Sequence, residues 1–202
     1  MTEIALQVAN YNIDFWVEGV WYPAAVDMNF EVQAGKVLAI VGESGSGKST
    51  AAMGLMDLLA SNARSSGSVK VKGQEMLGAK QALIRKTRGR EVAYIFQEPM
   101  TSLNPVLTIG EQIAEVLRAH QGLSRKAAWE QAIALLDAVR IPNPKGRAGD
   151  YPFQMSGGQR QRAMIAMALA CAPKILIADE PTTALDVTIQ AQILDLLIGL
   201  QK

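Results

Sequence analysis

The chain has 202 residues and a formal net charge of +1; 49% of its residues are hydrophobic and 19% are charged. This composition predicts a folded domain with a substantial core, and the small net charge excludes a global field that would draw the chain to nucleic acid. The single cysteine, Cys171, excludes an internal disulfide framework. The sequence contains no run of about 18 uncharged apolar residues, so no membrane span is predicted.

Strand patterns dominate the first half of the chain. The unbroken apolar run over 37–41 is typical of a buried parallel strand, and a glycine-rich loop and a helix over about 49–59 follow it. The basic run over 85–90 is interpreted as a solvated turn. Further strands are predicted over 4–8, 13–17, 26–32, 69–71 and 92–96.

From Thr108 onward the hydrophobic period becomes helical. Thr108 and Glu111 form a candidate capping box, and Ser124 can cap a second helix. A helical block over about 100–160 is therefore flanked by strand–helix units, which predicts an α/β core with an α-helical insertion. The later elements are a helix over 157–170, a buried strand over 174–178 and a last helix over 187–200.

Residues 42–49 match the spacing G-x-x-x-x-G-K-[ST], which is typical of a phosphate-binding loop. Glycines let backbone N–H groups turn around an anion, and the following helix adds its positive end. We expect Lys48 to bridge the β- and γ-phosphates of ATP, Ser49 to ligate Mg²⁺ and Thr50 to donate toward the α-phosphate. The alternative is a flexible Gly/Ser linker, which the flanking apolar run and helix disfavour. The predicted nucleotide-binding residues are Gly42, Glu43, Ser44, Gly45, Ser46, Gly47, Lys48, Ser49 and Thr50.

Two carboxylates, Asp179 and Glu180, end the predicted strand over 174–178. We expect Asp179 to hold Mg²⁺ through its water shell and Glu180 to polarise the attacking water as a general base. Acidic strand ends are common, so this assignment depends on the phosphate loop upstream.

A third motif, Met-Ser-Gly-Gly-Gln, covers residues 155–159. Ser-Gly-Gly at the start of a helix provides an anion-binding terminus, and the alternative is an ordinary helix cap. With the two preceding motifs, the chain resembles the ATPase subunit of an ABC transporter, whose usual signature is L-S-G-G-Q. Met155 departs from that signature, whereas Ser156, Gly157, Gly158 and Gln159 match it.

Two shorter segments extend the resemblance. Residues 96–99 resemble the family's Q-loop, which implies that Gln97 contacts Mg²⁺ or the lytic water, and residues 181–186 resemble its D-loop, which implies that Asp186 lies at a dimer interface. The resemblance thus implies catalytic roles for Glu180, Gln97 and Lys48, and metal contacts for Ser49, Gln97 and Asp179.

An aromatic residue before the phosphate loop stacks on adenine in this family. Phe15 fits best by its position, ahead of Trp16, and Trp21 and Tyr22 also lie near in the sequence. Each of these residues has the alternative of belonging to the core.

The resemblance also implies a fold and a set of partners. It implies a P-loop NTPase α/β core with an N-terminal antiparallel β-subdomain over 1–97 and 163–202, and an inserted helical subdomain over 98–162. Two such subunits would close head to tail over two ATP molecules, as a homodimer or a heterodimer. Two membrane permeases, contacted through the surface near 97–104, and indirectly a solute-binding protein complete the implied assembly, at the cytoplasmic face of the membrane and without nucleic acid.

The runs 97–105 and 158–162 are similar to the oligopeptide, dipeptide and nickel importer branch of the family. Family members also use a switch histidine beyond the D-loop helix, whereas the only histidine here, His120, lies in the helical block. We therefore expect a shortened form that binds ATP but hydrolyses it poorly.

Two other function classes stay open. One is an ABC-type ATPase that acts on DNA or ribosomes, and the other is a nucleotide-binding module without turnover. The first of these carries long coiled-coil or zinc-bearing insertions, whereas the helical insertion here is short and has no Cys/His cluster. The sequence therefore favours transport, with import of peptides or a related small solute.

Overall fold

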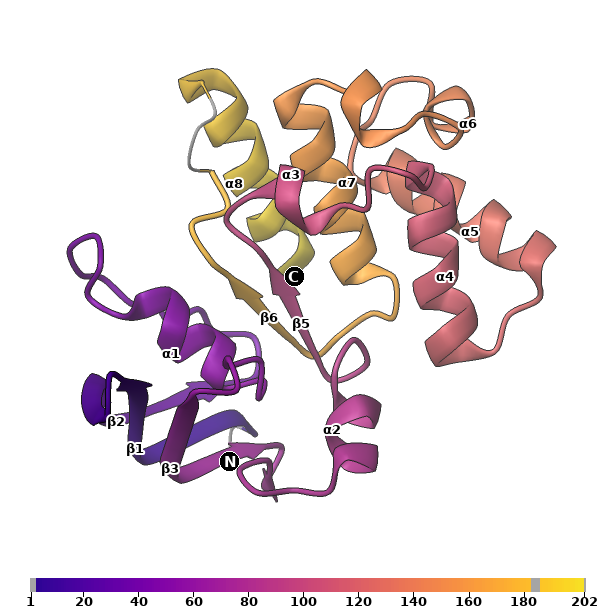
Figure 1. Ribbon diagram of the computed structural model, residues 1–202. Helices are drawn as coiled ribbons and strands as arrows, with labels where there is room; N and C mark the ends of the chain where they lie inside the picture. The colour runs from indigo at the N-terminus through magenta and orange to yellow at the C-terminus, as the bar shows by residue number, and fades with distance from the viewer. Residues whose placement is uncertain (1–2, 183–185, 202) are drawn as a thin grey trace. The chain divides into compact units, whose positions relative to one another are not determined.

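The computed structural model describes residues 3–182 and 186–201, and the chain divides into two units, residues 1–88 and 89–202. The first unit is built on a long antiparallel hairpin of β1 (Ile4–Val17) and β2 (Val20–Gln33) (Figure 1). Glu18 and Gly19 join the strands with φ of 48° and 87°, as the primed hairpin turns require. The strands predicted over 4–8 and 13–17 are therefore one continuous strand, and the strand predicted over 26–32 lies within a longer one.

The hairpin belongs to a four-stranded sheet in the order β2-β1-β3-β4, where β3 is Ala63–Val71 and β4 is Gln74–Glu75. Tyr11 and Ile13 of β1 are fully buried, and α1 (Lys48–Gly54) contacts β2. Gly54 permits close packing, because a Cβ there would fall against the Tyr11 hydroxyl. The helix is shorter than predicted, since it ends before residue 59.

The strand predicted over 37–41 is wrong. These residues adopt no strand conformation, and Val37 and Val41 are 75% and 90% exposed. A buried parallel strand needs hydrogen-bonded neighbours and covered faces. The described strands of the first unit pair only with one another, in an antiparallel sheet, so the apolar run has no ladder to join there.

The basic run over 85–90 is also more ordered than predicted. Its first half belongs to α2 (Gln81–Thr87). Arg88 Nε donates to the backbone carbonyl of Met56 at 2.8 Å, and its guanidinium pairs with Asp57 at 3.7 Å. The run therefore anchors a helix end within the first unit.

The second unit contains a parallel pair, β5 (Val92–Ile95) and β6 (Ile175–Ala178), with Val92 opposite Ile175 and Ile95 opposite Ala178. All four residues of β5 are buried, as expected for a covered parallel strand. The predicted α/β class is thus confirmed. The helices are α3 (Pro99–Ser102), α4 (Ile109–Gln121), α5 (Arg125–Ala138), α6 (Pro144–Arg147), α7 (Gly157–Leu169) and α8 (Val187–Gln201), with a 3₁₀ turn over Pro152–Gln154.

The core of the second unit lies among its long helices, where α4 and α5 pack on each other and on α7 (Figure 1). The fully buried side chains include Ile113 and Leu117 of α4, Leu136 of α5, Ile165 of α7 and Ile193 of α8. The predicted cap residues are confirmed, since the side chains of Thr108, Ser124 and Ser156 accept N–H bonds at the starts of α4, α5 and α7. The capping box predicted for Thr108 and Glu111 is only half formed, because the Glu111 carboxylate pairs with Arg118 at 2.7 Å.

No helix in the described part of the chain combines the length and the apolar character needed to cross a membrane. The subdomain bounds predicted from the sequence, with a helical subdomain over 98–162, stay a prediction.

Candidate functional site

The predicted phosphate loop lies in the first unit, immediately before α1. The Lys48 ammonium donates to two carbonyl oxygens of its own loop, those of Gly42 at 2.8 Å and Glu43 at 2.7 Å. The Ser46 N–H donates to the Glu43 carbonyl at 3.2 Å, which closes a turn. The Lys48 ammonium thus lies against the backbone of its own loop, which brings a positive charge to a segment of the kind that binds phosphate.

Gly47 is the residue on which the shape of this loop depends most. It caps α1 in the left-handed region, with φ of 89°, and a Cβ there would fall against the carbonyl oxygen of Ala24. A side chain at this position is therefore strained in backbone conformation and also blocked by a neighbouring strand.

We expect Gly47→Ala to abolish measurable ATP binding, because the loop cannot keep its shape. The matched control is Gly35→Ala, since Gly35 has a similar φ of 71° but open space around its Cβ position. The control should lose about 1–2 kcal/mol of folding stability and keep its ATP affinity. Titration calorimetry with ATP and thermal unfolding measure both. Equal ATP affinities in the two variants would contradict this account of the loop.

Two of the predicted catalytic residues meet in the second unit. Gln97 follows β5 and Glu180 follows β6, and Gln97 Nε2 donates to Glu180 Oε2 at 3.0 Å. The backbone of Glu180 is left-handed, with φ of 43°. That conformation costs a non-glycine residue about 1–3 kcal/mol and is concentrated at functional sites. The strand ends therefore hold the carboxylate in a strained but hydrogen-bonded position.

Asp179 has a partner that the sequence analysis missed. Tyr94 of β5 donates its hydroxyl proton to Asp179 Oδ2 at 2.9 Å. Burial, and then the hydrogen bond and negative charge of Asp179, raise the pKa of Tyr94 well above its usual range. Tyr94 lies two positions before the start of the predicted Q-loop. The register of the parallel pair β5 and β6 was the signal that could have revealed its contact with Asp179.

The donor set at these strand ends fits Mg²⁺. In the described residues no group of three or more His, Cys, Asp and Glu side chains lies together as a metal cage. Mg²⁺ usually keeps several waters and takes one or two carboxylates together with substrate phosphates. Asp179 and Gln97 offer this kind of oxygen ligand at the strand ends. The metal contact expected of Ser49 stays a prediction.

The motif over 155–159 forms the N-terminal cap of α7, with Ser156 as the N-cap residue. Ser156 Oγ accepts the Gln159 N–H at 3.3 Å, and Gln159 Oε1 accepts the Ser156 N–H at 3.0 Å. A Cβ on Gly158 would lie 3.0 Å from Cγ2 of Ile189, so this glycine lets α7 and α8 approach closely. This reciprocal capping box fixes the segment, while its role toward nucleotide stays a prediction.

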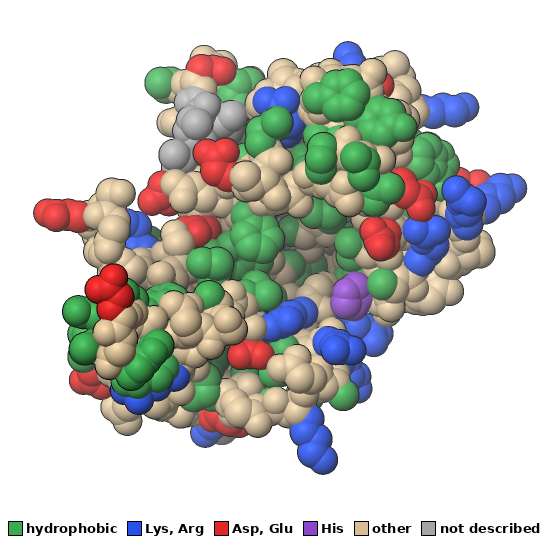
Figure 2. Space-filling model, viewed as in Figure 1, with side chains coloured by type: hydrophobic (Ala, Val, Ile, Leu, Met, Phe, Trp, Pro, Cys, Tyr) green, Lys and Arg blue, Asp and Glu red, His purple; other side chains and the backbone are tan. Residues whose placement is uncertain are grey.

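The aromatic candidates for adenine lie on the hairpin of the first unit. Phe15 is half-buried and stands opposite Tyr22, whereas the rings of Trp16 and Trp21 pack at 5.1 Å. Arg64 lies 4.1 Å from the centroid of the Trp21 ring. Hydrophobic side chains are visible where Figure 1 draws this hairpin (Figure 2). Trp21 is thus occupied by intramolecular contacts, and Phe15 stays the predicted adenine residue.

The predicted D-loop is only partly visible, because residues 183–185 lie outside the described residues. Asp186 Oδ1 accepts the Ile189 N–H at 2.9 Å, so Asp186 caps the start of α8. Its expected place at a dimer interface stays a prediction.

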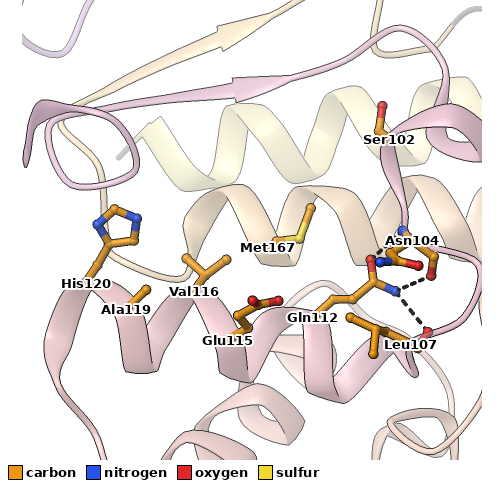
Figure 3. A pocket seen from close by; sticks show the side chains of 9 residues that line it. All are labelled: Ser102, Asn104, Leu107, Gln112, Glu115, Val116, Ala119, His120 and Met167. Carbon is orange, nitrogen blue, oxygen red and sulfur yellow. Dashed lines mark hydrogen bonds between the residues drawn. The ribbon is translucent and has the colours of Figure 1, made fainter. Parts of the chain in front are cut away.

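A cavity of about 240 Å³ opens in the second unit between α4, α7 and the loop that follows α3 (Figure 3). The amide of Gln112 holds this loop, since its Oε1 accepts the Asn104 N–H at 2.8 Å and its Nε2 donates to the carbonyls of Asn104 and Leu107 at 3.0 and 3.1 Å. The cavity is therefore a fixed hollow at the end of the segment that the sequence analysis associated with permeases. Its lining comprises Ser102, Asn104, Leu107, Gln112, Glu115, Val116, Ala119, His120 and Met167.

Known proteins resemble this chain over nearly its whole length. The family model described as ABC transporter matches residues 25–183. An ATP-binding protein of Brucella abortus named for peptide import is 53% identical over 97% of this chain and 59% of its own length. The oligopeptide transport ATP-binding protein OppD of Escherichia coli is 50% identical over 98% of this chain and 58% of its own length. The chain thus spans about three fifths of the length of these curated relatives.

A solved structure is similar as well. A dimeric ATP-binding cassette in a post-hydrolysis state, bound to ADP and Pi, matches with a TM-score of 0.86 and 29% identity. The match covers 98% of this chain and 83% of that one.

Proposed function

The chain belongs to the ABC transporter family, and we propose that it is the part of a peptide importer that binds and hydrolyses ATP. The observation that carries the proposal is the hydrogen bond from Gln97 to Glu180, beside Asp179 at the ends of two parallel strands. Three residues that the sequence assigned separately to one reaction thus lie together. The names of the relatives supply the transported class, peptides.

In the proposed reaction, the chain works mainly by positioning and by charge. The loop over 42–50 binds the phosphates of ATP, with Lys48 at the β- and γ-phosphates and Phe15 against adenine. Glu180 accepts a proton from the attacking water, and Gln97 holds Glu180 for that task. Ser49, Gln97 and Asp179 would hold Mg²⁺, which when bound neutralises the charge of the phosphates. Such preorganised charges are the main source of rate in phosphoryl transfer.

A second ATPase subunit, identical or different, completes the proposed site. The start of α7 at Ser156 presents N–H groups and a positive dipole end, which suits a γ-phosphate held by the other subunit. The dimeric state of the similar cassette supports this arrangement. The pair would bind at the cytoplasmic face of the membrane.

The hollow beside α4 is the proposed docking place for a membrane permease. It lies at the end of the segment that starts at Gln97, so a permease segment seated there could sense the γ-phosphate through Gln97. Ala119 is exposed on α4 and lines the hollow, whereas Ala134 is exposed on α5 outside it.

The test expresses the protein together with the two membrane subunits of a peptide importer. The protein should sediment with membranes and copurify with two permeases, and Ala119→Arg should reduce copurification at least about tenfold, as the loss of a well-packed interface contact does. Ala134→Arg should leave it unchanged. Sedimentation with ribosomes or DNA instead of membranes would favour the other ATPase class and contradict the proposal.

A further inference from the structure

The contact between Tyr94 and Asp179, at the ends of β5 and β6, is a feature that the proposed reaction leaves unexplained. The Tyr94 side chain lies in a strand interior and only 8% of the residue is exposed, yet its hydroxyl reaches Asp179 Oδ2 at 2.9 Å. A carboxylate has no proton to give, so the phenol is the donor.

Both ends of this hydrogen bond are held by the fold. Tyr94 stands opposite Ile177 in the parallel ladder, so Asp179 lies two residues beyond its partner, on the same face. The Asp179 N–H donates to the Ile95 carbonyl at 3.0 Å, which extends the ladder and fixes the aspartate backbone. On the other side, the Tyr94 ring packs against Phe96, with centroids 4.6 Å apart and planes tilted by 43°.

We propose that Tyr94 is a positioning residue that orients the Asp179 carboxylate toward hydrated Mg²⁺. This inference rests on the proposed function, in which Asp179 is a metal contact. A hydrogen bond to one carboxylate oxygen fixes the plane of the whole group, because both oxygens turn about the same bond. Loss of such a partner typically lowers metal affinity about 10–100-fold. Tyr94 acts only through Asp179.

Tyr94→Phe separates this role from packing. The substitution keeps the ring and its contact with Phe96 and removes only the donor. Tyr151→Phe is the matched control, because it removes a hydroxyl in the same unit while keeping the stacking of Tyr151 on Phe153, whose centroids are 5.6 Å apart. Mn²⁺ replaces Mg²⁺ as the probe, and electron paramagnetic resonance measures its dissociation constant at saturating ATP. ATP affinity in EDTA and thermal unfolding are measured on the same chains.

We expect Tyr94→Phe to raise the Mn²⁺ dissociation constant about tenfold and to leave metal-free ATP affinity unchanged, while Tyr151→Phe changes neither. An unchanged or tighter Mn²⁺ affinity in Tyr94→Phe would overturn the inference, and so would a lowered unfolding temperature with normal Mn²⁺ binding, which would make the hydroxyl structural. A wild-type chain that binds no ATP would instead overturn the proposed function, and this inference with it.

Discussion

Lys48→Ala is expected to weaken ATP binding by about 10- to 100-fold, because hydrogen bonds to charged groups contribute about 1.5–3 kcal/mol and each 1.4 kcal/mol is about tenfold. In the structure the Lys48 ammonium lies within the loop, 2.8 and 2.7 Å from two loop carbonyls. Phosphates bound by the loop would therefore interact directly with the positive charge of the Lys48 ammonium. Titration calorimetry with ATP in Mg²⁺ measures the effect directly.

The control for this variant is Lys36→Ala. Lys36 is an exposed lysine in the turn after β2, outside the phosphate loop, so its replacement removes the same charge from the same unit. Its ATP affinity should match that of the wild-type chain. A Lys48→Ala chain that binds ATP as tightly as Lys36→Ala would show that the nucleotide lies elsewhere.

Glu180→Gln is expected to slow ATP hydrolysis by about 10²- to 10⁴-fold, the usual contribution of a general base. The carboxamide has the shape of the carboxylate and keeps an oxygen that can accept the Gln97 N–H, so the local geometry should survive. It lacks the negative charge that takes a proton from water. ATP affinity should therefore stay within about twofold, since the change affects a group used in the transition state.

Hydrolysis is measured by phosphate release from the whole protein, with Glu130→Gln as the control. Glu130 is exposed on α5, so that variant loses an equal charge away from the strand ends. Its rate should equal that of the wild-type protein. A Glu180→Gln variant with unreduced turnover would remove Glu180 from the role of base.

Local signals predicted much of the second unit. Thr108, Ser124 and Ser156 begin their helices as predicted, because a capping side chain bonds an N–H only two or three residues away. The strand predicted over 174–178 is confirmed as β6 from its apolar run, although only Ile175 of β6 is buried and Ala178 is exposed. Such patterns depend on neighbours in the sequence, so the sequence alone contains them.

Features that depend on distant partners were missed. The run over 37–41 has the composition of a buried strand, but a strand also needs a hydrogen-bonded neighbour, and composition does not supply one. The contact of Tyr94 with Asp179 depends on the register of β5 against β6 across 85 residues of sequence. The family resemblance implied that Gln97 and Glu180 serve one reaction, whereas their direct hydrogen bond was not predicted.

The central claim is that the loop over 42–50 binds the phosphates of ATP. The most direct test is a titration of the ¹⁵N-labelled chain with ATP and Mg²⁺, followed by NMR. The account predicts that the largest amide shifts fall on residues 42–50 and saturate with ATP concentration. Saturable binding of ATP that leaves the amides of residues 42–50 unmoved would contradict it.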